Sequence, residues 1–167
     1  IQSDSSSYTI TSSSVSAETW HHVAVSFGSD GLKLFVDGGL AASNTYTGGL
    51  NHVSGGNTEP FTLGASTFNS GTGVLTPLAE YFAGYIDDAA LLNHQLAAGD
   101  VTELYNASQS LVGASIVDPA TDSDAIGFWR LGETSGTTAV DETVNNNDGT
   151  YSNVALGATG ATIDGDN

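Results

Sequence analysis

The chain has 167 residues, of which 39% are hydrophobic, with 21 Gly and no Cys or Met. This composition is too apolar for a disordered tail, and it suits short strands joined by tight turns more than a bundle of helices. Only two basic residues stand against 19 acidic ones, and the formal net charge of −17 excludes nucleic acid and anionic lipid surfaces as partners.

The first strong pattern predicts a β-hairpin. Residues 20–27 predict a half-buried strand, with Val23, Val25 and Phe27 on one face and Trp20, His22, Ala24 and Ser26 on the other. A second alternating run covers residues 32–36, and a return strand is predicted at residues 40–42. Asp37 and Gly38 separate these two runs, and they predict a hairpin turn because Gly accepts positive φ at little cost.

Further elements follow along the chain. Short apolar runs predict strands at residues 61–64, 81–87, 89–92 and 125–131. A short helix is predicted near residues 98–105, with acidic Asp100 near its start, where a negative charge suits the helix dipole. Polar, Gly-rich loops are expected at residues 43–60 and 65–79.

Three motifs resemble the laminin-G-like, concanavalin A-like family of surface proteins. They are a hairpin motif at residues 20–25 and 34–38, a closing motif at residues 82–105, and an opening motif at residues 128–137 and 145–151. The resemblance implies an all-β fold, a concanavalin A-like jelly-roll β-sandwich with one short helix. It also implies an extracellular location. Since the chain has no Met and no visible signal peptide or membrane span, we expect an internal piece of a longer secreted precursor.

The motifs stand in an unusual order, because the family's closing half comes first. We therefore predict three parts: residues 1–108 form the C-terminal part of one module, residues 109–123 a linker, and residues 124–167 the N-terminal part of a following or permuted module. In the family the opening and closing strands are expected to be neighbours. Residues 1–108 alone would leave an unpaired edge, to be filled by an upstream part of the module or, by exchange, by residues 125–131.

Catalytic patterns are missing from the sequence, and we expect no enzyme. The ExDxxE spacing of glycosidases on similar sandwiches does not occur, and neither does a G-x-S-x-G elbow. His21 and His22 are adjacent on a predicted strand. Their side chains should point to opposite faces, so the two rings cannot form one catalytic or metal site.

A structural calcium ion is the best-founded chemical hypothesis. Calcium prefers oxygen ligands from carboxylates, amides and carbonyls. The candidate ligands are Asp141, Asn145, Asn147 and Asp148 in one loop, with Asp87 at the end of a strand expected beside it. The alternative is that these Asp and Asn residues only form turns, which is a common use of both.

Sugar binding is the next candidate. The aromatic residues that could stack on a sugar are Tyr46, Phe68, Tyr81 and Trp129, although aromatics in a sandwich more often fill the core. The favoured function is a non-catalytic extracellular adhesion or architectural module of a large repetitive surface, filament or virion protein. Its partners would be neighbouring copies or modules, glycans or surface proteins. The alternative is an accessory carbohydrate-binding module of a secreted polysaccharide-degrading enzyme.

Overall fold

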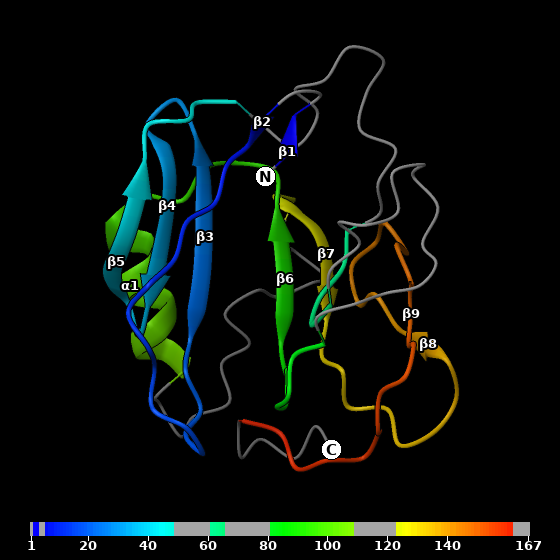
Figure 1. Cartoon of the computed structure of the whole chain (residues 1–167). Helices are drawn as coiled ribbons and strands as arrows, with labels where there is room; N and C mark the ends of the chain where they lie inside the picture. The colour runs from blue at the N-terminus through cyan, green and yellow to red at the C-terminus, as the bar shows by residue number, and fades with distance from the viewer. Residues whose placement is uncertain (1, 4–5, 49–60, 66–80, 109–122, 162–167) are drawn as a thin grey trace.

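A computed structural model gives the fold of the chain (Figure 1). The structure describes residues 2–3, 6–48, 61–65, 81–108 and 123–161. The chain begins with a small hairpin of β1 (Gln2–Ser3) and β2 (Ser6–Ser7), which pair antiparallel. The other described elements form a three-stranded sheet, two strand pairs and one helix.

The predicted hairpin is confirmed and is part of the largest sheet among the described residues. β3 (Val23–Gly28), β4 (Gly31–Val36) and β5 (Gly39–Asn44) pair antiparallel in chain order. Asp37 and Gly38 make the turn at φ values of 50° and 74°, the left-handed region that a tight hairpin requires.

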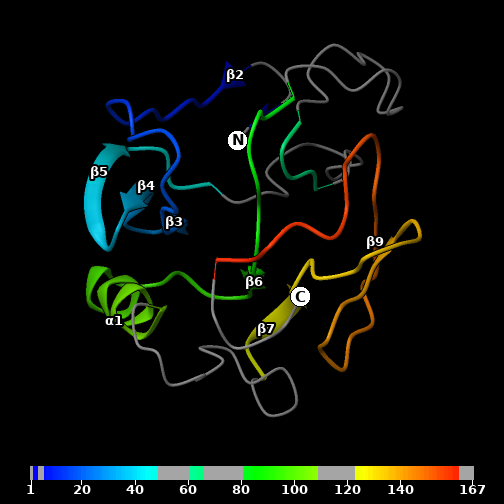
Figure 2. The same ribbon diagram turned by 90° about the horizontal axis from the view of Figure 1, so that it is seen from below.

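One face of this sheet is covered by the helix α1 (Ala98–Ser108), which lies across it in Figures 1 and 2. Phe35 is 1% exposed and Val101 of the helix is fully buried, so the two belong to the core between sheet and helix. Polar bonds fix the contact: Ser26 Oγ donates to Leu96 O at 2.8 Å, and Thr102 Oγ1 donates to the carbonyl oxygen of Gly38 at 3.1 Å. The predicted helix is therefore confirmed and runs three residues further than expected.

A second sheet joins two distant parts of the chain. β6 (Ala89–Leu92) pairs antiparallel with β7 (Ala125–Trp129), with a register irregularity between Leu91 and Leu92. β7, within the predicted opening strand at residues 125–131, thus lies along β6 of the same chain, and exchange between copies stays a prediction. The opening strand after the linker lies on the closing strand before it (Figure 1).

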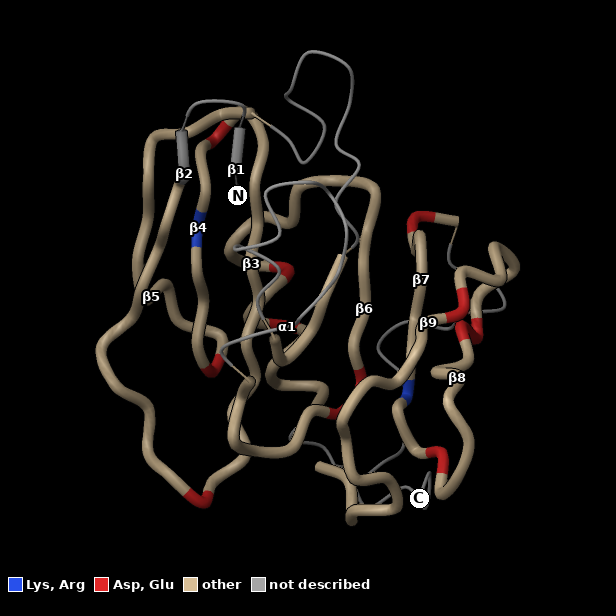
Figure 3. Tube along the Cα trace, turned by 45° about the vertical axis from the view of Figure 1, so that its right-hand side comes forward, with Lys and Arg blue, Asp and Glu red and all other residues tan. Residues whose placement is uncertain are grey.

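Residues 130–161 fold back beside β7 and carry a further strand pair. β8 (Thr138–Ala139) and β9 (Gly149–Thr150) pair antiparallel, and Ala139 is buried. Acidic positions are spread over both the β3–β5 sheet and this segment, as Figure 3 shows. Among the described residues the negative charge is therefore not confined to one element.

Two predicted strands are wrong. Residues 61–65 and 81–88 form bends and extended chain without a ladder. A single backbone bond joins them, from Phe82 N to Gly64 O at 2.8 Å, and Gly64 has a φ of 72° that a regular strand does not allow. Alternating apolar residues were read as a strand, but Phe82 and Tyr85 are exposed, so the pattern does not mark a buried face here.

The fold class is confirmed in its coarse form, since strands dominate and α1 is the one helix among the described residues. The closed jelly-roll sandwich stays a prediction, as do the domain boundaries. Most of the two predicted loops, at residues 49–60 and 66–79, falls outside the described residues. Within the described ranges no helix has the length and apolar character needed to cross a membrane.

Candidate functional site

Asp141 is the centre of the most connected polar cluster in the described chain. Its side chain is 4% exposed, and its carboxylate accepts four hydrogen bonds. Oδ1 accepts the N–H groups of Phe128 and Thr143, each at 2.9 Å; Oδ2 accepts Thr143 Oγ1 at 2.9 Å and Asn147 N at 2.7 Å. Burial alone would raise the pKa of Asp141, but these donors outweigh it and the pKa is lowered.

Asn145 and Asn147 use their side-chain amides to close the outer edge of β7. Asn145 Nδ2 donates to the carbonyl oxygens of Ala125 and Ile126 at 2.9 and 3.1 Å, and Asn147 Nδ2 donates to Ile126 O at 2.8 Å. Side chains thus replace a neighbouring strand at this edge, which would otherwise be unpaired.

The remaining predicted calcium ligands divide between two places. Asp148 Oδ1 accepts Asp141 N at 3.0 Å, so it belongs to the same loop. Asp87 lies elsewhere, where its Oδ2 accepts Ala161 N at 2.6 Å. Burial and the hydrogen bond to Glu133 raise the pKa of the nearby Tyr151, and the charge of Asp87 adds to that shift. Among the described residues no three His, Asp or Glu side chains gather as a metal-holding group. The loop residues do what turn-forming Asp and Asn do, and calcium binding stays a prediction.

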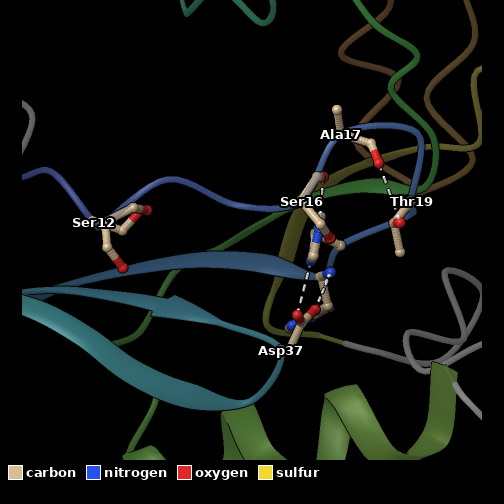
Figure 4. A network of polar contacts seen from close by, with 8 residues as sticks. Ser12, Ser16, Ala17, Thr19 and Asp37 are labelled. Carbon is tan, nitrogen blue, oxygen red and sulfur yellow. Dashed lines mark hydrogen bonds and ion pairs between the residues drawn. The ribbon is translucent and has the colours of Figure 1, made fainter.

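A second polar network joins the β4–β5 turn to the segment that precedes β3 (Figure 4). Nδ1 of His21 lies 2.8 Å from Oδ2 of Asp37, and Oδ1 of Asp37 accepts His22 N at 3.1 Å. On the other side of the ring, Nε2 of His21 lies 2.9 Å from Ser16 Oγ and 3.1 Å from Ser16 O. An open cavity of about 270 Å³ lies here, lined by Ser12, Ser13, Ser14, Val15, Ser16, His21, Val36, Asp37 and Ala41.

Ser16, His21 and Asp37 lie in hydrogen-bond contact in that order, with the imidazole between the other two side chains. The hydrogen bond to Asp37 raises the pKa of His21, and the same bond lowers the pKa of Asp37. The carbonyl oxygen of Ser16 can only accept, so its contact with Nε2 also favours a proton there. Contacts on both sides of the ring make the network a clamp between the turn at Asp37 and Ser16.

His22 has a separate environment. Burial lowers its pKa, its ring lies 6.1 Å from that of Tyr105, and its Nδ1 is buried with no hydrogen-bond partner among the described residues. The two histidines lie just before β3, which begins at Val23, and not on a strand as predicted, and their rings have different surroundings.

The predicted aromatic residues do not form one surface. Tyr46 is buried against Tyr8, with ring centroids 3.9 Å apart, and Trp129 is half-buried with its Nε1 donating to Asn147 O at 3.0 Å. Tyr81 is exposed, and its hydroxyl accepts Asn153 Nδ2 at 3.1 Å. Phe68 lies outside the described residues.

Sequence reasoning missed a different aromatic pair. Trp20 is 43% exposed and Tyr85 is 69% exposed, and their ring centroids lie 6.4 Å apart at an interplanar angle of 41°. The two residues come from segments 65 positions apart in the sequence. Trp20 was assigned to a family motif and Tyr85 to a strand, and no local pattern indicates that both rings face solvent together.

Comparison with known proteins identifies the family. A family model described as the concanavalin A-like lectin/glucanases superfamily matches residues 1–102, more than half of the chain. The chain belongs to the concanavalin A-like lectin/glucanase superfamily. That superfamily includes both enzymes and non-enzymes, so membership leaves catalysis untested. The match contains the Trp20–Tyr85 pair and the His21 clamp, and it ends before the Asp141 cluster.

No curated protein matches the chain. Among solved structures, the superfamily member described here is similar to a crystal structure of an S-layer domain-containing protein from Clostridium thermocellum, at 25% identity and a TM-score of 0.44. The match covers 56% of this chain and 42% of that one, so the chain spans less than half of the solved structure.

Proposed function

We propose that the chain is a non-catalytic extracellular module that binds glycans through Trp20 and Tyr85. The observation that carries this proposal is the exposed pair itself. Aromatic rings present a large apolar face, and burying such a face against the C–H surface of a sugar is favourable. Exposed large aromatics that lie together commonly mark a binding surface.

The charge of the chain narrows the class of glycan. At a net charge of −17, sugars that carry carboxylate or sulfate groups would be repelled. Trp20 and Tyr85 offer stacking without a fixed cationic partner, and the two basic side chains have acidic neighbours. Lys33 Nζ lies 3.9 Å from Asp30, and Arg130 Nε donates to Glu142 at 2.9 Å. The proposed ligand is therefore a neutral glycan.

A glycan array followed by calorimetric titration tests the proposal. Neutral glycans should bind, and Trp20→Ala or Tyr85→Ala should weaken binding by about tenfold, corresponding to the loss of one stacking contact of about 1.4 kcal/mol. Val144→Ala, at an exposed apolar residue of the Asp141 loop, is the matched control and should bind as the wild type does. Binding that both aromatic variants retain, or an array with no neutral hits, would refute the proposal.

The setting of the module is part of the same proposal. An acidic surface without Cys suits a protein exposed to saline surroundings, and the superfamily includes lectins. We place the module in a surface, filament or virion protein. A catalytic domain in the flanking sequence would instead mark it as an accessory carbohydrate-binding module.

A further inference from the structure

Trp20 and Tyr85 lie on the segments that lead into β3 and β6. These two strands point the same way, so both residues are at the same end of the fold (Figure 1). The ring centroids are 6.4 Å apart and the ring planes differ by 41°. The relative placement of the two rings determines which physical form of a neutral glycan they can bind.

Hydrogen bonds hold the loop that carries Trp20. Ser16 Oγ lies 2.9 Å from Nε2 of His21, and this contact closes residues 16–21 into a loop that contains Trp20. Nδ1 of His21 and the N–H of His22 both contact the carboxylate of Asp37, at 2.8 and 3.1 Å. The backbone on either side of Trp20 is therefore fixed relative to the β4–β5 turn.

The segment that carries Tyr85 is held on both sides. Three residues before it, Phe82 N donates to Gly64 O at 2.8 Å. Two residues after it, Asp87 Oδ2 accepts Ala161 N at 2.6 Å. Because the backbone at both rings is held in the free protein, the pair meets its ligand with little reorganisation, which favours binding.

The distance and the angle between the rings each exclude one way of binding. Aromatic rings in contact with one another have centroids roughly 4.5–7 Å apart. At 6.4 Å no sugar fits between Trp20 and Tyr85, so each ring can stack only through a face that points away from the other. Because the two planes differ by 41°, one flat surface cannot lie against both rings at once.

We infer that the pair binds two consecutive sugars of a single glycan chain that bends or twists between them, and not the flat face of a crystalline polysaccharide. The inference rests on the proposed function and adds the physical form of the ligand. A free chain can turn at its glycosidic bond, so that one sugar lies on each ring. The apolar area removed from water is then larger than on a flat face, where only one ring could be fully covered.

Soluble and crystalline forms of the same neutral polymer test the inference. The probes are cellohexaose with microcrystalline cellulose, and chitohexaose with crystalline chitin. The wild type should bind a hexasaccharide in a calorimetric titration, and Trp20→Ala or Tyr85→Ala should weaken that binding by about tenfold. The crystalline form should remove no more wild type from solution than it removes of Tyr85→Ala. Val144→Ala, at a residue that is 77% exposed, is the control and should behave as the wild type does.

The two possible failures differ in what they overturn. If the crystalline form removes more wild type than Tyr85→Ala protein, the rings bind a flat face, and the inference fails while the proposed function stands. If neither hexasaccharide binds and the array shows no neutral glycan that binds, the proposed function fails and the inference fails with it.

Chain length supplies the second measurement, by NMR titration with glucose and cellobiose, or with the monosaccharide and disaccharide of whichever neutral glycan binds on the array. A disaccharide covers both rings, so the loss of either ring should cost about tenfold. A monosaccharide covers one ring at a time, so the same loss should cost at most about twofold. Equal losses for the two sugars would show that one sugar contacts both rings and would overturn the inference. Since Tyr85 is 69% exposed, Tyr85→Ala decides if Trp20→Ala does not fold.

Discussion

Nδ1 of His21 lies 2.8 Å from Oδ2 of Asp37, while Nε2 of the same ring contacts both oxygens of Ser16. One imidazole therefore links the β4–β5 turn to the segment before β3. The pKa of His21 is raised above its ordinary 6.5 and that of Asp37 is lowered below its ordinary 3.8. At pH values between these two pKa values, His21 and Asp37 therefore favour the form in which both are charged.

The clamp predicts a pH-dependent stability. Because the folded pKa of His21 is raised, its contribution is complete below about pH 6.5 and is lost as the pH rises through the folded value. The contribution of Asp37 is present above its unfolded value and is lost as the pH falls through the lowered one. His21→Asn should lower the melting temperature most between about pH 4 and 6.5, and less above neutral pH.

Asp37→Asn is the reciprocal test of that clamp. It should remove stability over the same pH window, and combining it with His21→Asn should add little to either single change. Melting curves from pH 4 to 9 for the wild type and three variants supply the measurement. Additive effects of the two substitutions, or a wild-type advantage that grows above neutral pH, would contradict the clamp.

Among substitutions in residues 123–161 that each remove one charge, Asp141→Asn should destabilise the fold most. An amide cannot accept all four hydrogen bonds that the carboxylate accepts, and it leaves buried N–H groups of the loop without a partner. We expect a loss of about 2–4 kcal/mol in the free energy of unfolding, by urea denaturation. Glu142→Gln removes the same charge from a partly exposed ion pair with Arg130 and should cost at most about 1 kcal/mol.

The free energy of unfolding of the same two proteins at acid pH gives a second test. Since the pKa of Asp141 is lowered on folding, its contribution is present above the ordinary Asp range and is lost as the pH falls through the folded value. The difference between wild type and Asp141→Asn should therefore shrink in acid. A constant difference from neutral pH down to about pH 2 would show that the hydrogen bonds to the carboxylate are not its source.

Calcium binding is tested by titration of chelator-treated protein. If Asp141, Asn145, Asn147 and Asp148 hold the ion, calcium at a hundredfold excess over Kd should stabilise the fold by about 2.7 kcal/mol and raise the melting temperature. Asp148→Asn should weaken that effect, and Asp87→Asn, which lies elsewhere, should not. If the titration releases no heat and the melting curve does not shift, the residues do not bind calcium and only form turns.

The sequence predicts most where structure is local. The hairpin, its turn at Asp37 and Gly38, and the helix beginning at Ala98 follow from alternation, turn chemistry and length, and all three are confirmed. The strands predicted over residues 61–64 and 81–87 failed because apolar alternation cannot tell a buried strand from an exposed extended segment. The candidate binding site could be predicted even less well than these strands, because its residues are far apart in the sequence. Trp20 and Tyr85 become a pair only after the chain has folded.

Gly127 in β7 lies directly against the indole ring of Trp129. A Cβ at residue 127 would lie 2.4 Å from the Trp129 indole, so Gly127→Ala must displace a ring whose Nε1 donates to Asn147 O. We expect a loss of about 1–3 kcal/mol and a red shift of Trp fluorescence as the indole becomes more exposed to water. Gly99→Ala is the matched control, because no atom lies within 4 Å of its added Cβ. It sits in α1 and should stabilise the fold by about 0.5–1 kcal/mol, since Ala favours the helix. Equal effects of the two substitutions would show that the contact with Trp129 does not hold β7 in place.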